Sequence, residues 1–375
     1  MSSDPAARAG AILEIDLGAL VANWRLLAAR AAPAQCSAVV KANGYGLGAA
    51  QVGRALAAAG CRTFFVATLD EGITLRSALG GETEIAVLNG PLPGTADEFA
   101  AHKLIPVLNE PGQIEAWRSF AALRGPLPAM LHVDTGMSRL GLTPCEFAAF
   151  ADDLSRWKSI HWHLLMSHLA CADTPEHELN ETQRHRFEAA RKRLPGVPAS
   201  LAASSGIFLG PGYRLDLVRP GAALYAVNPK PGAPNPLRPV VRLQGKILQI
   251  REIDRGESVG YGAMHVMQAP GRIATVAVGY ADGWLRSLSH RGCGHIAGIR
   301  VPLLGRVSMD LLTFDVSAID SAMAYPGAMI ELLGDSYGID DAATDAGTIG
   351  YEILTALGSR YHRIYRGPAE ANSPA

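Results

Sequence analysis

The 375-residue chain has few features of a membrane, nucleic-acid-binding or disulfide-bonded protein. Its five cysteines are scattered and form no CxxC pair, so neither a disulfide framework nor a metal site of zinc type is indicated. The net charge of −1 gives no global field that would recruit nucleic acid or an acidic membrane. No signal peptide is recognised, and no stretch approaches the ~20 uninterrupted apolar residues that cross a bilayer. We therefore expect a cytoplasmic protein with reduced thiols.

The first two thirds of the chain alternate between short apolar runs and helix-like segments. Hydrophobic residues make up 48% of the chain, which is sufficient for a full core. The candidate strands are 38–41, 64–68, 85–89, 105–109, 130–134, 163–168, 199–204 and 216–221. Apolar residues at three- and four-residue spacing predict helices over 49–59, 70–79, 113–123, 144–157 and 183–194. Eight such units in about 220 residues indicate a (β/α)₈ barrel, although an open doubly wound sheet also uses them.

The pattern changes at 227–239, which is rich in Pro, Gly and Asn and is typical of a linker. Strand-like segments follow at 240–252, 272–280, 295–304, 311–316 and 328–333, and a last helix opens at Thr348 and stops near Gly358. We predict an N-terminal barrel over 11–232 and a C-terminal, mostly β domain over 233–375. A strand at 11–17 is compatible with packing on the second domain.

Several predicted strands end in polar residues, and Lys41 is the most informative of them. A partly desolvated amine at a barrel mouth loses proton affinity and becomes a candidate nucleophile or base. The other polar ends are Asp134 with Arg139, His168, Ser204, and Arg219 with Gly221. Each residue alone is compatible with a structural role, but in a barrel all of them converge on one rim.

Two segments close the seventh and eighth predicted strands and contain small residues. They are Ser204-Ser205-Gly206 and Arg219-Pro220-Gly221. Small residues let backbone N–H groups approach an anion, and barrels often bind phosphate at this place. A lysine nucleophile beside a phosphate cradle indicates pyridoxal phosphate held as a Schiff base.

Five ordered motifs carry a resemblance to a known family. They are Val39 to Gly46 (VVKANGYG), Val133 to Gly141 (VDTGMSRLG), Val218 to Tyr225 (VRPGAALY), Val278 to Gly283 (VGYADG) and Gly305 to Asp310 (GRVSMD). From about residue 11 to 365 the chain resembles the bacterial alanine racemases, which are fold-type III pyridoxal phosphate enzymes.

The resemblance implies a role for each matching residue toward the cofactor. Lys41 is expected to form the Schiff base. The residues expected around the phosphate are Tyr45, Ser204, Gly221, Ala222 and Tyr351. Arg219 is expected to face the pyridine nitrogen, His168 to lie against the ring, and Arg139 to approach the phenolic oxygen.

The resemblance also implies the groups that meet the substrate. Arg139 and the backbone N–H of Met309 are expected at the substrate carboxylate. Tyr261 is expected to be the second base, opposite Lys41, contributed across a head-to-tail homodimer. Tyr280 is expected to guard the entrance, and no metal ion is expected.

The chain departs from the commonest family pattern at four places. His132 stands where many members have a lysine that becomes carbamylated and orients the arginine here numbered Arg139, so another group must position Arg139. Ala203 replaces a common asparagine, Leu47 a frequent histidine and Ser308 a common cysteine. None of these changes removes Lys41 or a second base.

The resulting hypothesis is the interconversion of L- and D-alanine, which supplies D-alanine for peptidoglycan. A broader racemase that accepts serine is one alternative, because one extra hydroxyl is only weakly rejected by pocket size. A fold-type III amino-acid decarboxylase and a pyridoxal phosphate-binding protein without turnover are the others.

Overall fold

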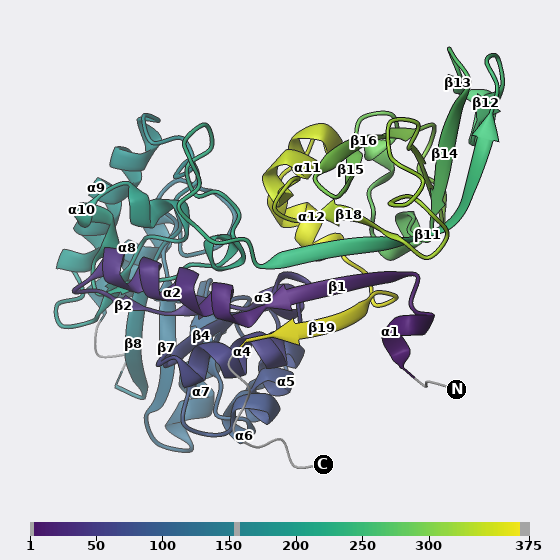
Figure 1. The fold of residues 1–375 in the computed structure, drawn as a ribbon. Helices are drawn as coiled ribbons and strands as arrows, with labels where there is room; N and C mark the ends of the chain where they lie inside the picture. The colour runs from purple at the N-terminus through teal and green to yellow at the C-terminus, as the bar shows by residue number, and fades with distance from the viewer. Residues whose placement is uncertain (1–3, 154–157, 368–375) are drawn as a thin grey trace. The chain divides into compact units, whose positions relative to one another are not determined.

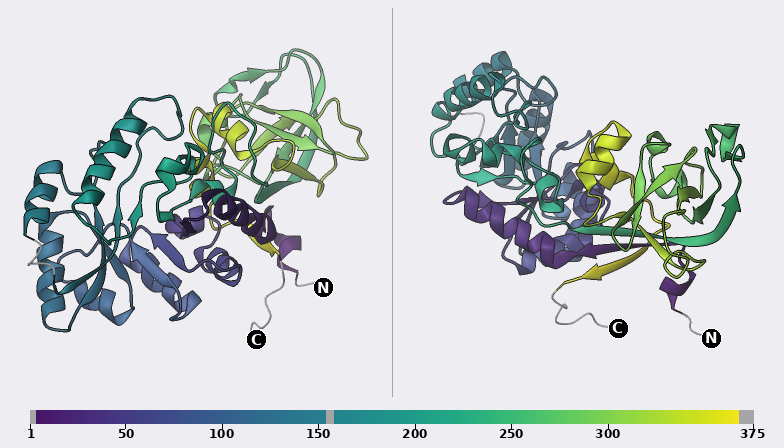
Figure 2. Two further views of the ribbon diagram at one scale, coloured as in Figure 1. Left: turned by 90° about the vertical axis from the view of Figure 1, so that its left-hand side faces the viewer. Right: turned by 45° about the horizontal axis from the view of Figure 1, so that its top comes forward.

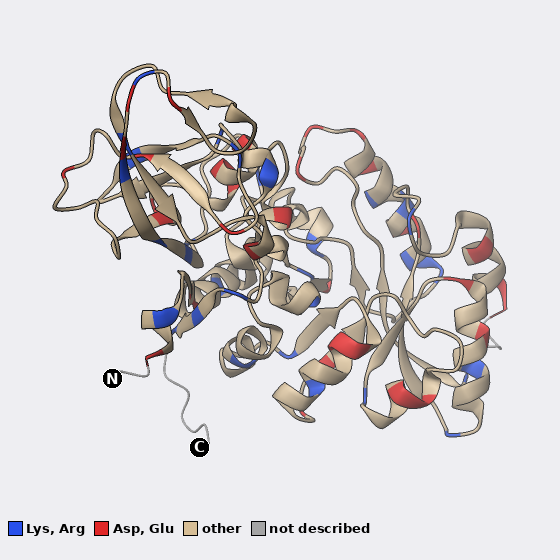
Figure 3. Cartoon of the chain, turned by 90° about the vertical axis from the view of Figure 1, so that its right-hand side faces the viewer, with Lys and Arg blue, Asp and Glu red and all other residues tan. Residues whose placement is uncertain are grey.

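The computed structural model describes residues 4–153 and 158–367, which divide into two compact units (Figure 1). The barrel unit comprises Leu20–Leu224 and Asn228–Leu237, and the second unit contains the other described residues. No helix among the described residues is long and apolar enough to cross a membrane. Lys and Arg are interspersed with Asp and Glu over both parts of the chain (Figure 3).

The barrel unit is built on parallel strands that pair in chain order. They are β3 (Ala38–Val39), β4 (Thr63–Val66), β5 (Glu84–Val87), β6 (Ile105–Leu108), β7 (Leu127–His132), β8 (Ile160–Met166) and β9 (Ala199–Ser200). β10 (Leu217–Val218) pairs with β2 (Gln35–Cys36), and the amide of Arg219 donates to the carbonyl of Ala202 at 2.9 Å, so the ring closes. The predicted (β/α)₈ barrel is thereby confirmed.

Helices lie outside the strands of this unit (Figure 2). They are α2 (Leu17–Ala31), α4 (Ala49–Ala58), α5 (Leu69–Leu79), α6 (Ala96–Ala101), α7 (Pro111–Ala122), α8 (Pro144–Asp152), α9 (Leu179–Lys192) and α10 (Pro211–Arg214). Capping boxes begin α5 at Thr68 and α8 at Thr143, where the hydroxyl and the third-residue glutamate satisfy free amides. Strands covered on both faces read as apolar runs, and every residue of β4 is buried.

The second unit is mostly β, as predicted. β11 (Val241–Ile253), β14 (Gly271–Val276), β17 (Leu312–Asp315), β16 (Ile299–Leu304), β15 (Cys293–Ile296) and β18 (Met329–Leu333) pair in that order, and β18 returns to β11. β1 (Ala11–Asp16) pairs with β11 and with β19 (His362–Arg366). The unit also contains α1 (Pro5–Arg8), β12 (Ser258–Val259), β13 (His265–Val266), α11 (Ile339–Ala346) and α12 (Gly350–Ala356), besides short 3-10 helices.

Several predicted elements differ in their bounds. The single strand expected at 295–304 is the hairpin β15–β16, because Ala297 (φ +50°) and Gly298 (φ +79°) form a two-residue turn. The helix expected at 144–157 ends at Asp152, and residues 154–157 lie outside the described residues. Helices α2 and α11 were not predicted.

Candidate active site

Lys41 lies in a strained turn at the carboxyl end of the first barrel strand. β3 ends at Val39, and α3 (Lys41–Tyr45) is not a right-handed helix, because Ala42, Asn43, Gly44 and Tyr45 all have φ between +51° and +64°. Left-handed backbone is unfavourable for residues other than glycine and persists where its surroundings fix it. Here the Glu71 carboxylate accepts the amide of Ala42 at 2.7 Å and that of Ala67 at 2.8 Å. Glu71 thus ties the turn to the start of α5.

The pKa of the Lys41 amine is lowered, first by burial and then by the positive charge of Arg139. The negative charge of Glu71 opposes this change. A larger fraction of the amine is therefore unprotonated near neutral pH than for a free lysine, and this form is the nucleophile and the base.

Arg219 is a buried cation that has no carboxylate partner among the described residues. It is 3% exposed, and its guanidinium donates to the Ser200 hydroxyl and to the Ser167 carbonyl at 2.6 Å. Burial lowers its pKa to about 10, so it remains charged at neutral pH. Neutral oxygens therefore fix its orientation without cancelling its charge.

Two histidines stay neutral near these cations. Burial and then the charge of Arg219 lower the pKa of His168 to about 3 and that of His132 to about 4. The charges of Arg139 and Lys41 also act on His168, so the structure brings four of the predicted residues together at one end of the barrel.

His132 belongs to a hydrogen-bond chain that fixes its tautomer. The Asn109 amide nitrogen donates to the carbonyls of Leu88 and Val107, both at 2.9 Å. The Asn109 oxygen must therefore accept from His132 Nδ1, which lies at 2.8 Å. Neutral His132 carries its proton on Nδ1, and its Nε2 is an acceptor.

The loop that carries Arg139 is organised by Asp134. Its carboxylate accepts the backbone amides of Gly136, Met137 and Ser138 at 2.8 to 3.0 Å, and these bonds lower its pKa against the effect of burial. The exposed guanidinium of Arg139 forms no hydrogen bond or ion pair with another described residue. It is therefore available to an anionic ligand.

A small cradle forms where β9 and β10 end. The Ser204 hydroxyl accepts the amides of Gly221 at 3.0 Å and Ala223 at 3.1 Å. A Cβ built on Gly221 would collide with the Tyr45 hydroxyl and lie 3.0 Å from its Cζ, so only glycine allows this approach. Within the described residues the amide of Ala222 has no acceptor. The cradle thus offers free donors to an anion.

The other predicted residues, Tyr261, Tyr280, Met309 and Tyr351, belong to the second unit. Tyr261 lies between Gly260 (φ +76°) and Gly262 (φ +74°) and is 72% exposed. Tyr280, Met309 and Tyr351 are also exposed. The structure describes each of them within its own unit and does not join them to the barrel residues.

Sequence reasoning missed the residues that support the site. Besides Ser167 and Ser200, fully buried Gln183 on α9 donates to the His168 carbonyl at 2.8 Å and to Thr135 Oγ1 at 3.2 Å. The two serines could have been recognised in the sequence, since each is a polar residue within or beside a buried strand. For Gln183 the sequence offers only its position on the inner side of a helix.

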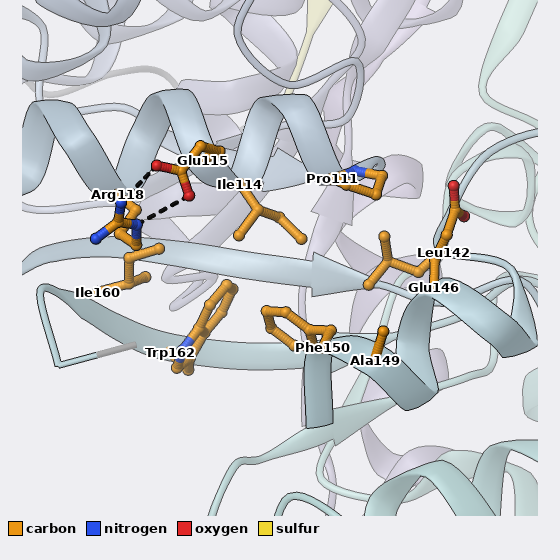
Figure 4. Close-up of a pocket in the computed structure, with 10 residues that line it drawn as sticks. All are labelled: Pro111, Ile114, Glu115, Arg118, Leu142, Glu146, Ala149, Phe150, Ile160 and Trp162. Carbon is orange, nitrogen blue, oxygen red and sulfur yellow. Dashed lines mark hydrogen bonds and ion pairs between the residues drawn. The ribbon is translucent and has the colours of Figure 1, made fainter. Parts of the chain in front are cut away.

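An apolar groove of about 330 Å³ lies elsewhere in the barrel unit, between α7 and α8 (Figure 4). Ile114, Phe150 and Trp162 line it, and Arg118 and Glu115 pair at its edge. None of the predicted site residues borders this groove.

The fold and the site together define an α/β-barrel enzyme with a desolvated lysine among anion-binding groups. Family models match the alanine racemase N-terminal domain over residues 15–229 and the alanine racemase C-terminal domain over 240–365. The chain belongs to the alanine racemase family and is an isomerase of alanine.

Relatives support this assignment over nearly the whole chain. An alanine racemase of Rhodospirillum rubrum is 54% identical, with 97% of this chain and 98% of the relative covered. A catabolic alanine racemase of Mesorhizobium japonicum is 53% identical, with 96% and 94% covered. The alanine racemase of Bartonella henselae, solved with covalently bound pyridoxal phosphate, has a TM-score of 0.92 at 42% identity, with 96% and 100% covered.

The two buried histidines predict how stability depends on pH. Both have pKa values below those of the unfolded chain, so their contribution is complete above about pH 6.5 and is lost as pH falls toward 4. The loss should reach roughly 3 kcal/mol per histidine. The measurement is the urea midpoint between pH 7.5 and 4.5 for wild type, His168→Asn and a control, His102→Asn.

We expect His168→Asn to flatten this pH dependence and the half-buried control, His102→Asn just after α6, to leave it unchanged. A wild-type slope that both variants share would show that His168 is not responsible.

Proposed function

We propose that this protein racemises alanine with pyridoxal phosphate bound through Lys41, using Lys41 and Tyr261 as bases on opposite faces of the substrate Cα. The observation that carries the proposal is the desolvated Lys41 amine in its strained turn, beside Arg139 and at the end of the barrel that bears the Ser204 cradle. Family membership supplies the substrate and the reaction.

The residues of the barrel unit fit this cofactor. The free amide of Ala222 and the Ser204 hydroxyl suit a phosphate, and the Tyr45 hydroxyl lies against Gly221 beside them. The guanidinium groups of Arg139 and Arg219 supply positive charge, and the Asp134 carboxylate is already occupied by three amides. When bound, pyridoxal phosphate supplies an electron sink that acidifies the Cα–H bond of the amino acid.

The chain's own groups then determine where protons go. Lys41 Nζ accepts a proton on one face of Cα and returns one there in the opposite direction. Charged Arg219 would face the ring nitrogen of the bound cofactor and would keep its own proton there, so electron withdrawal by the ring would be limited and racemisation would be favoured over transamination. Neutral His168 adds no further charge beside it.

Tyr261 is proposed as the proton carrier on the other face, provided by the second subunit of a homodimer. Its side chain is exposed to solvent, as are those of Met264 and Val266 at the β12–β13 hairpin. A cluster of exposed apolar residues is typical of a protein contact. Tyr280 and Tyr351 are proposed to border the same site and to limit the size of the substrate side chain.

Arg139 and the Met309 amide are proposed to bind the substrate carboxylate. Both are free for it, since neither the guanidinium nor this N–H has a partner among the described residues. Racemisation of serine remains the second candidate activity. The product D-alanine is proposed to serve peptidoglycan synthesis in the cytoplasm.

Replacing Lys41 tests its attachment to the cofactor. We expect Lys41→Ala to lose the visible absorbance of bound pyridoxal phosphate and to lower racemisation on the order of 10³-fold or more. Borohydride reduction of wild type should place the pyridoxyl group on the peptide that contains Lys41. Lys192→Ala on α9 is the control. A pyridoxyl group on another lysine would overturn the assignment.

Gly221→Ala tests the phosphate cradle. The new Cβ would press on Tyr45, and overpacking of about 1–3 kcal/mol should weaken cofactor affinity roughly 5- to 150-fold. The measurement is titration of the apoenzyme with pyridoxal phosphate. The control is Gly81→Ala, which meets nothing within 4 Å. Wild-type affinity in Gly221→Ala would remove this loop from the cradle.

Tyr261→Phe tests the second base, because it removes only the hydroxyl. In D₂O we expect the variant to retain cofactor and to exchange the Cα proton of one alanine enantiomer with deuterium much faster than that of the other. Tyr325→Phe, another exposed tyrosine of the second unit, should behave as wild type. Equal, small losses for both enantiomers would exclude Tyr261 as a base.

A further inference from the structure

Two loops of the second unit carry the proposed substrate-facing groups and are joined to each other. The amide of Tyr280 donates to the Ser308 carbonyl at 3.0 Å, and that of Ala281 donates to the Met309 carbonyl at 2.9 Å. A Cβ built on Gly279 would collide with the Met309 carbonyl, so the backbones are in direct contact. The loop that carries Tyr280 therefore holds the peptide that carries Met309.

Met309 is presented by a tight turn. Ser308 Oγ donates to the Leu311 carbonyl at 2.6 Å and accepts the Leu311 amide at 3.2 Å. The Met309 carbonyl is occupied by Ala281, whereas its N–H donates to no described residue. The direction of this free donor depends on how firmly the turn is held.

Arg360 connects both loops from a third segment, between α12 and β19. Its Nε lies 3.0 Å from Asp282 Oδ1, and its Nη1 donates to Asp310 Oδ1 at 2.7 Å. Asp282 is 4% exposed, and its second oxygen accepts the Gly279 amide at 2.8 Å. One guanidinium thus bonds to two carboxylates: that of Asp282, in the loop that carries Tyr280, and that of Asp310, which follows Met309.

The two ends of this bridge differ in what they stabilise. The segment before Arg360 is already attached to the Tyr280 loop, because the Gly358 amide donates to the Asp282 carbonyl at 2.9 Å. Asp310 and Arg360 are both about half exposed, and an exposed pair of this kind adds little to folding stability. The bond to Asp310 therefore contributes mainly by fixing the residue next to Met309.

We propose that Arg360 is a positioning residue for substrate binding. It holds the loops that carry Tyr280 and Met309 in a fixed position relative to each other, so that the Met309 N–H meets the substrate carboxylate. This inference rests on the proposed function, since that proposal assigns Met309 to the carboxylate. A donor that contacts the carboxylate in both the ground state and the transition state contributes to KM more than to kcat.

The test compares Arg360→Met, Arg360→Lys and Asp310→Ala with wild type, as cofactor-loaded enzymes. We expect Arg360→Met and Asp310→Ala to raise KM for both alanine enantiomers roughly tenfold, with kcat changed less than about threefold. Arg360→Lys, which reaches one carboxylate but not both, should have an intermediate KM. The control Arg366→Met removes an exposed pair with Glu14 on β1 and should leave KM unchanged.

Asp310→Ala removes the acceptor but keeps the bond between Arg360 and buried Asp282, so it tests the inference even if Arg360→Met fails to fold. A wild-type KM in folded Asp310→Ala, with only a change in melting temperature, would reduce Arg360 to a structural ion pair and overturn the inference alone. Absence of alanine racemisation in wild type would instead overturn the proposed function, and the inference with it.

Discussion

The structure of the candidate site depends on burying the positive charge of Arg219 without a carboxylate. In the part of the chain that the structure describes, its guanidinium is held by the Ser200 hydroxyl and the Ser167 carbonyl and by no carboxylate. Burial is the larger reason that His132 and His168 stay uncharged, and the buried guanidinium, which is hydrogen-bonded but not neutralised, adds to it by repelling further protons. Its charge, together with that of Arg139, can be balanced by a phosphate and a carboxylate. The low basicity of the two histidines therefore follows from burial first and from Arg219 second.

The fold stabilises this arrangement by placing it on rigid elements. The strands β3, β7 and β8 are largely buried within the barrel unit, and the loops that follow them are fixed by hydrogen bonds to the carboxylates of Glu71 and Asp134 and from the amide of Gln183. The left-handed turn at Lys41 is one cost of that placement, because four successive residues adopt backbone that only glycine favours. The core formed by the apolar strands outweighs such local costs.

The sequence predicted the barrel because buried parallel strands appear as apolar runs, and it predicted the candidate residues because they follow those runs in recognisable motifs. It did not separate β15 from β16, since a turn of Ala297 and Gly298 interrupts the apolar pattern by only two residues. Gln183 and Arg360 could not be found in this way. Arg360 meets Asp310 across 50 residues of chain, and no local pattern records such a contact. The proposed role of Tyr261 involves a second subunit, which lies beyond what a single chain's pattern can indicate.

The most direct test of the account follows the optical rotation of L-alanine and of D-alanine in parallel with the same cofactor-loaded preparation, while total alanine is measured chemically. The account predicts that both rotations decay to zero with equal kcat/KM, because the two enantiomers have equal free energy, and that no alanine is lost. A rotation that stops away from zero, or a decay accompanied by loss of alanine to another product, would contradict racemisation as the reaction of this protein.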